Sequence, residues 1–572
     1  MLARRALLLW LLGALLALPA LWVGFHEDDF IQRVALAGSL SGYERGPLSL
    51  YEFVRGGPEN LQLMNDGLIP WFSDPELRIR FFRPLSSLLV ALDAEVFGRH
   101  AMPAIAHSLL WFAVCCWLVT RIHRQLLPER AAFWASLVFV VAGSHAASLA
   151  WIAARHVLVG GAFALAAWLV QLRTRERDSK LGWAGVALLG TGLLASEAAL
   201  AVLPFVLFPI ALRPVPLRAR LRAALPWLLV PLLYLGFYVG AGYGPARMGS
   251  YVNPLETPLR FALDLGSRLP QLMAETFSGV PAILGTFGGP TRSALIIVGY
   301  LAFGFIAWMF LQRRRELGAE QLPWLPVAFV ASMVPVAGTI LDGRVLLIPM
   351  AGSSMMIGAL IALALDNRLP KSQRRRGERL GLVVLLLLNF ALSPLARLGI
   401  VLATAQISRL EAAMPERARI RCASGARVLL VGGSDPAVGL YAASIFRFSD
   451  RAPWRSFHVL TMAPNDLTLH RDGPNSFVMR IVGPRETNFA EQLYRSQPLP
   501  RGARVTLAAL SVQVLEAVEE GPTAARFELA NETVDEVCFL RWQGGPDGYL
   551  ESFSLPDRGV LELPHVPGPM GR

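Results

Sequence analysis

The sequence predicts a polytopic, all-α membrane protein of about eleven transmembrane helices, followed by a mostly-β extracytoplasmic domain. The mean hydropathy is +0.46, and 54% hydrophobic against 17% charged residues is outside the range of soluble proteins. Apolar runs of about 18 to 22 residues, long enough to cross a hydrocarbon core of about 30 Å, recur along the chain. Beyond residue 405 they shorten to strand length, which predicts a transmembrane domain at 1–405 and a second domain at 406–572.

The first apolar run covers residues 6–23 and follows Arg4 and Arg5. It is longer than the apolar part of a signal peptide, about 7 to 15 residues, so we expect a retained first helix with a cytoplasmic N-terminus. Residues 25–82 are polar and rich in aromatic residues, glycine and proline, which predicts a large external loop. Residues 83–98 have the pattern of an amphipathic helix lying at the membrane interface.

The remaining apolar runs alternate with short loops rich in arginine. The predicted spans are 104–121, 131–153, 156–172, 181–195, 198–212, 225–243, 293–312, 322–341, 344–365 and 380–398. Every second connection carries a basic cluster, and such loops mark the cytoplasmic side. An odd number of spans then places the C-terminal domain outside the cytoplasm. The net charge of +12 is thereby explained by membrane topology, which argues against nucleic-acid binding.

The C-terminal domain shows strand-length apolar runs separated by glycine, proline and aspartate turns. The run VLLVGGSDP resembles a dinucleotide-binding turn, but it lacks the third glycine and an evident following helix, so a plain strand and turn is expected. Cys422 and Cys538 would be able to form a disulfide in an oxidising compartment. Cys115 and Cys116 lie inside an apolar run, where packing is their expected role.

Three adjacent acids, Glu27, Asp28 and Asp29, follow the first helix on the predicted external side. Adjacent carboxylates repel one another, and partial burial would raise the pKa of at least one. Such a group can act as a general base towards a hydroxyl or coordinate a divalent cation. The alternative is ordinary solvated charge at a helix end.

Further ionisable residues fall in tight external turns, where an ion near the bilayer core costs roughly 2.5 to 3.5 kcal/mol and so usually has a partner or a function. Arginine forks match phosphate oxygens, so this group predicts a pocket for an anionic lipid headgroup. A charge that reaches into water from its turn is the alternative for each residue alone. The substrate-binding candidates are Arg83, Arg155, His156, Glu197 and Arg344.

Three stretches, FFRPLSSLLVALDAEVFGRHAMPAIAHSLLWFAV, HAASLAWIAARHVLVGGAFALAAWL and LLASEAALAVLPFVLF, resemble the GT-C superfamily of membrane glycosyltransferases. The likeness covers about residues 1–365 and is closest to transmembrane-and-TPR O-mannosyltransferases and bacterial relatives. It implies transfer of a sugar from a polyprenyl-phosphate donor at the external membrane face. Asp28 or Asp29, preceded by Glu27, would be the catalytic base or metal ligand, and Arg155 and Arg344 would bind the donor phosphate.

The sequence departs from this family in two places. Ser196 precedes Glu197 where the family usually has a lysine, and the C-terminal domain contains no TPR repeats. The expected partners are a polyprenyl-phosphate-linked sugar, membrane lipid and an acceptor glycan, lipid or protein, with a divalent cation as a candidate cofactor. The predominance of arginine over lysine favours a bacterial inner (plasma) membrane.

The sequence is also compatible with two other functions. These are a non-catalytic scaffold that binds envelope components and a transporter of lipid-linked sugars. A transporter usually carries ionisable residues at mid-membrane depth, whereas most acids here fall at the ends of predicted spans.

Overall fold

The computed structural model describes residues 2–39, 43–174, 181–365, 376–486 and 488–571, which form two compact units. The bundle unit comprises Met1–Val23, Phe82–Gly242 and Val252–Ala405, and the sheet unit comprises Gly24–Phe81, Tyr243–Tyr251 and Gln406–Arg572. One boundary between the units follows Ala405, and the predicted domains, 1–405 and 406–572, stay a prediction. The segment expected as a loop of the transmembrane domain, 25–82, instead folds with the sheet unit, because its helices and strands pack there.

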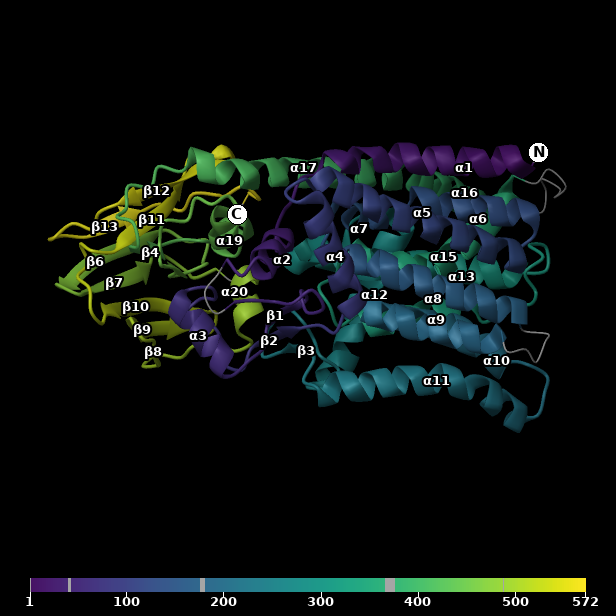
Figure 1. Cartoon of the computed structure of the whole chain (residues 1–572). Coiled ribbons are helices and arrows are strands. Elements are labelled where there is room, and N and C mark those ends of the chain that lie inside the picture. Colours follow the sequence, from purple (N-terminus) through teal and green to yellow (C-terminus); the bar gives the residue numbers. More distant parts are fainter. Residues whose placement is uncertain (1, 40–42, 175–180, 366–375, 487, 572) are drawn as a thin grey trace. The chain divides into compact units, whose positions relative to one another are not determined.

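The bundle unit is built of helices that run side by side over most of their length (Figure 1). Its α-helices are α1 (Leu2–Ala17), α4 (Pro84–Phe97), α5 (Ala101–Leu126), α6 (Glu129–Val141), α7 (Ala146–Ala150), α8 (Arg155–Thr174), α9 (Leu181–Ala195), α10 (Leu203–Ala211), α11 (Leu217–Gly240), α12 (Pro258–Ser278), α13 (Gly289–Arg313), α14 (Leu325–Met333), α15 (Leu347–Ala364) and α16 (Arg376–Leu387). The helix α17 (Ser393–Arg417) begins in the bundle unit and ends in the sheet unit.

Short 3-10 and π turns join or extend these helices. They are η1 (Leu18–Trp22), η2 (Gly143–His145), η3 (Glu197–Val202), η4 (Ala282–Phe287), η5 (Val334–Val336), η6 (Gly343–Leu346) and the π turn η8 (Leu388–Leu392). Several stand directly before a longer apolar helix, so that a polar turn and a buried helix follow each other.

Six helices among the described residues are long and apolar enough to cross a membrane, or seven if α6 and the bent segment after it form one span. Four shorter apolar helices accompany them, and every predicted apolar run falls on a helical segment. Large side chains such as Leu232, Leu233 and Leu301 point outward, with 64%, 64% and 69% of their surface exposed. An apolar exterior of this kind identifies an integral membrane protein, whereas the number eleven stays a prediction.

The segment predicted as an amphipathic interfacial helix is α4. Ser86, Ser87 and Asp93 on this helix are buried, whereas Leu88 and Leu92 are exposed. The polar face of α4 therefore points into the bundle and its apolar face points outward. This helix is held by internal polar contacts, and its position at the interface stays a prediction.

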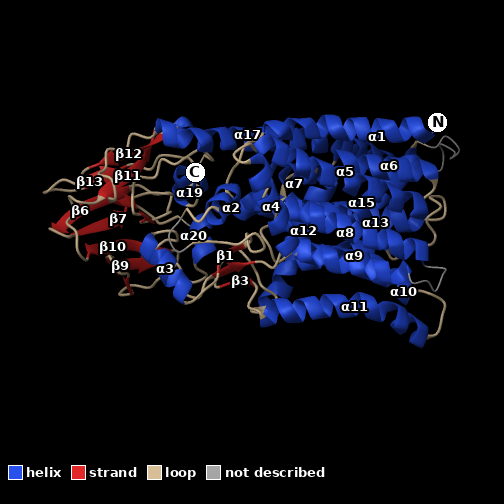
Figure 2. Ribbon diagram, in the orientation of Figure 1, coloured by secondary structure: helices blue, strands red, loops and turns tan. Residues whose placement is uncertain are grey.

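Among its described residues, the strands of the sheet unit form three sheets (Figure 2). A small antiparallel sheet contains β1 (Glu52–Val54), β2 (Arg78–Arg80) and β3 (Gly244–Ala246). A six-stranded antiparallel sheet has the order β13 (Leu561–Leu563), β6 (Leu467–Gly473), β7 (Ser476–Ile481), β10 (Gly521–Leu529), β9 (Leu510–Val518) and β8 (Arg504–Thr506). The helices of this unit are α2 (Asp28–Leu36), α3 (Pro58–Asp66), α18 (Pro436–Gly439), α19 (Ala442–Phe448) and α20 (Phe489–Tyr494).

The third sheet is mixed, in the order β12 (Tyr549–Phe553), β11 (Cys538–Gln543), β4 (Arg427–Leu430) and β5 (Ser456–Val459). Strand β4 is parallel to both β5 and β11, and α18 and α19 connect β4 to β5. The expected plain strand and turn at VLLVGGSDP is therefore wrong in part, because a helical crossover follows the turn. All four residues of β4 are buried, as is typical of a central parallel strand covered on both faces.

A disulfide joins Cys422 and Cys538, whose Cα atoms are 5.7 Å apart. It links the segment before β4 to the first residue of β11. Cys115 and Cys116 are free thiols buried in α5, in agreement with their predicted packing role. Disulfides persist in oxidising compartments.

Loss of this disulfide should destabilise the sheet unit, because the bridge closes a long loop of 116 residues in the unfolded chain. We expect Cys422→Ser to lower the free energy of unfolding by about 2–5 kcal/mol, measured by thermal or chemical unfolding in detergent, with Cys115→Ser as the control. The denatured wild-type protein should bind maleimide at two thiols before reduction and at four after it. Four reactive thiols without reductant would contradict the assignment.

Candidate functional site

Arg83 and Glu197, both predicted as substrate-binding residues, form an ion pair in the bundle unit. Arg83 immediately precedes α4, and its Nε donates to Glu197 Oε2 at 2.9 Å. Its Nη2 donates to the other carboxylate oxygen, so that the contact is bidentate. Glu197 is the first residue of η3. The turn after α9 and the start of α4 are therefore joined through charge.

His156 lies beside this pair. Its Nδ1 is 2.9 Å from Ser196 Oγ, and the same hydroxyl accepts a hydrogen bond from Ala198 N at 3.3 Å. Ser196, at the position where the family usually has a lysine, is thus a helix cap and a histidine partner. The charges of Arg83 and Arg344 both act on the His156 ring. Four predicted residues therefore gather in one place, and Arg83, His156, Glu197 and Arg344 are called the arginine cluster below.

Arg344 enters this cluster from η6, just before α15. Its guanidinium lies over the Trp151 ring, 4.8 Å from the ring centroid. Its Nε is 3.9 Å from Asp342 Oδ2, while Asp342 Oδ1 accepts the backbone N–H of Arg344 at 2.9 Å. The carboxylate therefore caps the turn, and its contact with the guanidinium is long.

Arg155 does not join the arginine cluster. It is 1% exposed and forms an ion pair with Asp93, which is 2% exposed. Its Nε donates to Ser108 Oγ at 2.8 Å and its Nη2 to Ala104 O at 2.5 Å. His107 Nδ1 lies 2.9 Å from the other oxygen of Asp93. These contacts use the guanidinium within the protein, so they favour a structural role over the predicted phosphate contact.

The sequence analysis missed Glu275, which lies on α12 in a stretch for which no span was predicted. Its Oε2 accepts the backbone N–H of Ala282 at 2.8 Å. Burial, together with the nearby charge of Asp342, raises the pKa of Glu275 to about 8. Glu275 therefore holds its proton more tightly than an exposed carboxyl does, close to the turn that carries Arg344. Only its burial, which the sequence does not reveal, distinguishes it from a surface glutamate.

Asp29, one of the predicted catalytic acids in the sheet unit, is the second residue of helix α2. It is 2% exposed, and its Oδ2 accepts the backbone N–H of His26 at 3.3 Å. In return, the backbone N–H of Asp29 donates to His26 O at 3.1 Å. The carboxylate and the backbone of Asp29 therefore both bond the backbone of His26 just before the helix. Burial lowers the pKa of His26 to about 4, so the neutral ring does not form an ion pair with Asp29 at pH 7.

Asp28, in contrast, is only partly buried. Its Oδ1 accepts a hydrogen bond from the Tyr441 hydroxyl at 3.1 Å. Burial, and then the charge of Asp28, raises the pKa of Tyr441 and that of Tyr494. Burial also raises the pKa of Tyr43, partly opposed by Arg45, and Asp28 adds to the rise. Asp28 is thus more exposed than Asp29, receives a hydrogen bond from one phenol and acts through its charge on two others.

Glu27 has a backbone conformation that side chains rarely adopt, with φ 50° and ψ −124°. Its backbone N–H donates to Oε2 of the buried residue Glu411 at 3.3 Å. Strain of this kind costs on the order of 1–3 kcal/mol and concentrates at functional sites. The acid motif is therefore held in place by its surroundings rather than by local preference.

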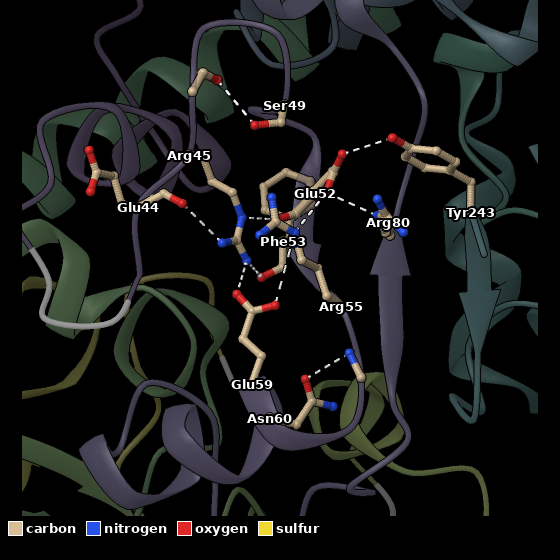
Figure 3. A network of polar contacts seen from close by, with 12 residues as sticks. Glu44, Arg45, Ser49, Glu52, Phe53, Arg55, Glu59, Asn60, Arg80 and Tyr243 are labelled. Carbon is tan, nitrogen blue, oxygen red and sulfur yellow. Dashed lines mark hydrogen bonds and ion pairs between the residues drawn. The ribbon is translucent and has the colours of Figure 1, made fainter. Parts of the chain in front are cut away.

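A second polar network of the sheet unit is centred on the buried residue Glu52 (Figure 3). Glu52 Oε2 accepts from Arg55 Nε at 2.7 Å and Arg80 Nε at 2.9 Å, and Oε1 accepts from the Tyr243 hydroxyl at 3.0 Å. Burial alone would raise the pKa of Glu52, but the hydrogen bonds from Arg80 and Arg55 outweigh it and the pKa is lowered. Because the network joins all three strands of the small sheet, we assign it a structural role.

Within the described ranges, no three histidine, cysteine, aspartate or glutamate side chains are arranged to hold a metal ion. A divalent cation at the acid motif therefore stays a prediction.

No known protein-family model matches this chain, and no curated protein matches it. Among solved structures, it is similar to the archaeal oligosaccharyltransferase AglB from Archaeoglobus fulgidus in complex with an inhibitory peptide and a dolichol-phosphate, at 12% identity and a TM-score of 0.42. That match covers 79% of this chain and 64% of the archaeal chain. The apo form of the Archaeoglobus fulgidus oligosaccharyltransferase matches at 11% identity and a TM-score of 0.35, over 75% and 64% of the two chains.

The assignment of Arg155 to the structure of the bundle predicts a large stability effect. Arg155→Ala leaves Asp93 charged and buried, so the free energy of unfolding should fall by about 3–5 kcal/mol. The double variant Asp93→Leu with Arg155→Met should recover most of this loss, because an apolar pair can replace a buried ion pair. Arg260→Ala, at an exposed ion pair, is the control and should change stability by less than about 1 kcal/mol. Wild-type stability in Arg155→Ala would contradict the assignment.

The strain at Glu27 predicts that a glycine variant is more stable than an alanine variant, the reverse of the usual order of stability. Glycine adopts positive φ freely, so Glu27→Gly should be more stable than Glu27→Ala by about 1–3 kcal/mol. At the exposed residue Glu76, which is not among the positive-φ residues, the order should reverse, because glycine gains more entropy on unfolding. Thermal unfolding of the four variants in detergent provides the measurement. The same order at both positions would show that Glu27 is not strained.

Proposed function

We propose that this protein is a glycosyltransferase that moves a sugar from a polyprenyl-phosphate donor to an acceptor hydroxyl at the external face of a bacterial inner membrane. The observation that carries the proposal is the arginine cluster of the bundle unit, in which Arg83 pairs with Glu197 and the charges of Arg83 and Arg344 both act on His156, at the ends of apolar helices. Arginine side chains at the ends of apolar helices suit the phosphate of a lipid whose chain remains in the bilayer. The resemblance of residues 1–365 to the GT-C superfamily supports the same class of reaction.

The arginine cluster is assigned to the donor phosphate. When the bond between the anomeric carbon and the phosphate oxygen breaks, negative charge develops on that oxygen, and guanidinium groups fixed beforehand stabilise it. Arg83 is held in position by Glu197 and Arg344 by Trp151. Because these partners fix both side chains, less reorganisation is needed when the charge develops.

Asp28 is assigned as the general base. It takes the proton of the acceptor hydroxyl, the hydroxyl oxygen attacks the anomeric carbon, and polyprenyl phosphate leaves. The hydrogen bond from Tyr441 orients the Asp28 carboxylate, and the bond from the His26 backbone N–H to the Asp29 carboxylate fixes the chain just before the helix. Asp29 and Glu27 thus help to position Asp28, Asp29 through its carboxylate and Glu27 through its backbone.

The proposal places the sheet unit outside the cytoplasm and the N-terminus inside. The Cys422–Cys538 disulfide supports an oxidising location for the sheet unit. The alternating basic loops support the same orientation. Alkaline phosphatase fused after Arg572 should be active, since this enzyme requires an oxidising compartment, and an inactive fusion would reverse the proposed topology.

Catalysis by Asp28 predicts loss of transfer without loss of donor binding. In a deletion strain, lipid-linked sugars should accumulate, and mass spectrometry should show that the wild-type chain removes them. Asp28→Asn should lower the transfer rate at least about 100-fold, since a general base contributes about that much. Asp264→Asn, at a partly exposed acid of α12 that pairs with Arg260, should transfer the sugar as the wild type does and serves as the matched control. Full activity in Asp28→Asn would end the assignment of the base.

The assignment of the arginine cluster to the donor phosphate predicts a loss of donor binding itself. Arg83→Ala and Arg344→Ala should weaken binding of undecaprenyl phosphate by about tenfold or more, as expected for loss of a charge-assisted contact, whereas Asp28→Asn should bind it normally. Native mass spectrometry of the purified chain can measure this binding. Unchanged binding in both arginine variants would favour the non-catalytic scaffold, which also requires no lipid-linked sugar to accumulate in the deletion strain.

A further inference from the structure

The sheet unit contains a cleft that the proposed transferase reaction does not use. Its volume is about 480 Å³, including the solvent at its mouth. The loop after β4 contributes Gly432 and Ser434, the end of β11 contributes Arg541 and Trp542, and the C-terminal segment contributes His565. The loop after β5 completes the wall.

This cleft lies where the topology of the mixed sheet favours a ligand. Strands β5, β4 and β11 are parallel, so their carboxyl ends share one edge. The chain leaves β4 through α18 and α19 to β5 on one side, and later returns as β11 on the other side. Such a reversal of strand order opens a crevice beyond the carboxyl ends, where open α/β sheets bind ligands.

Two side chains in the cleft form a nucleophile–base pair. Ser434 Oγ lies 2.9 Å from His565 Nε2, although the residues are 131 positions apart. Ser434 is 6% exposed and His565 is partly exposed. A serine hydroxyl within hydrogen-bond reach of an imidazole is the arrangement that activates serine for attack on a carbonyl.

Neighbouring groups hold both partners. Asp466 Oδ1 accepts the backbone N–H of His565 at 2.7 Å, and its charge acts on the imidazole. Asn488 Nδ2 donates to the carbonyl oxygen of Ser434 at 2.8 Å, which fixes the turn after β4. Asp466 and Asn488 are therefore positioning residues of the pair.

We propose that the sheet unit is a serine esterase, with Ser434 as nucleophile and His565 as general base, acting on short-chain carboxylic esters. Ser434 Oγ attacks the ester carbonyl while His565 Nε2 takes its proton. The C–O bond then breaks, His565 returns the proton to the leaving alcohol, and water hydrolyses the acyl-serine to a carboxylic acid. Arg541 lines the same cleft, and its guanidinium pairs with Glu551 at 3.2 Å.

The walls of the cleft bear on the substrate class. The volume of about 480 Å³ includes open solvent, so the enclosed part of the cleft suits only a short acyl group. The indole of Trp542 lines the cleft with apolar surface.

Burial lowers the pKa of His565, and the nearby carboxylates Asp466 and Glu486 oppose this shift. Because the folded-state pKa is below that of free histidine, the ring is neutral and able to accept a proton at pH 7. Hydrolysis should rise with pH through that lowered pKa and then level off.

The test uses the full-length chain in detergent, with p-nitrophenyl acetate as substrate and a fluorophosphonate probe. We expect the wild-type protein to hydrolyse the ester and to be labelled at Ser434, as located by mass spectrometry of the peptides. Ser434→Ala and His565→Gln should each lower kcat/KM at least about 100-fold. Ser449→Ala, whose hydroxyl donates to Phe446 O away from the cleft, should behave as wild type.

A positioning role predicts a smaller effect for Asp466→Asn. The variant should lose about tenfold in kcat/KM, and its pH profile should shift because the charge of Asp466 acts on His565. An intact Cys422–Cys538 disulfide and an unchanged melting temperature show that each variant is folded. No hydrolysis by the wild-type chain, labelling at another residue, or full activity in Ser434→Ala would overturn the proposal. These outcomes are independent of the transferase, since the Asp28 and Arg344 variants should keep the esterase activity.

Discussion

The buried ion pair between Arg155 and Asp93 is the interaction on which the geometry of the bundle unit depends. Lipid cannot satisfy a charge or an exposed backbone group, so a membrane bundle has to neutralise its ions internally. Here one guanidinium binds Asp93 of α4 and the Ser108 and Ala104 oxygens of α5, while its own backbone starts α8. Ser86 of α4 also donates to Ala195 O at 2.9 Å, at the end of α9. Four helices therefore meet through polar contacts on α4.

The position of α4 in turn decides where the arginine cluster can form. Arg83 directly precedes this helix, so its guanidinium reaches Glu197 only because α4 is fixed against α8 and α9. His156 follows Arg155 in the chain and reaches Ser196 for the same reason. A structural pair and a candidate binding group thus share one short segment of α8. The two adjacent residues differ in burial and contacts rather than in sequence environment.

The sequence predicted those features that depend on local pattern and could not predict those that depend on pairing. The apolar runs follow from hydropathy alone, and the helices of the described residues agree with them. The partner of Arg155 was missed because Asp93 is 62 positions away on a helix predicted to lie at the interface. Asp28 and Asp29 are the same residue type side by side, and only the bonds of Asp29 to the His26 backbone and the hydroxyl contact of Asp28 separate them. The Ser434–His565 pair depends on a fold that brings together residues 131 apart.

The glycines in the turn after β4 resemble those of a dinucleotide-binding turn, but a different physical constraint requires them. Gly433 comes so close to the backbone of Gly439 that a Cβ atom on it would lie 2.9 Å from the Gly439 Cα, and its own N–H donates to Thr461 O at 3.0 Å. The glycine is required by this close approach, and its amide is already used, so it is not available to a pyrophosphate. Asp435 accepts the N–H of Ala437 at 3.0 Å and that of Met570 at 2.6 Å, which ties the turn to the C-terminal segment that carries His565. The residues around Ser434 therefore act together to hold a serine hydroxyl at the end of a buried strand, facing the histidine.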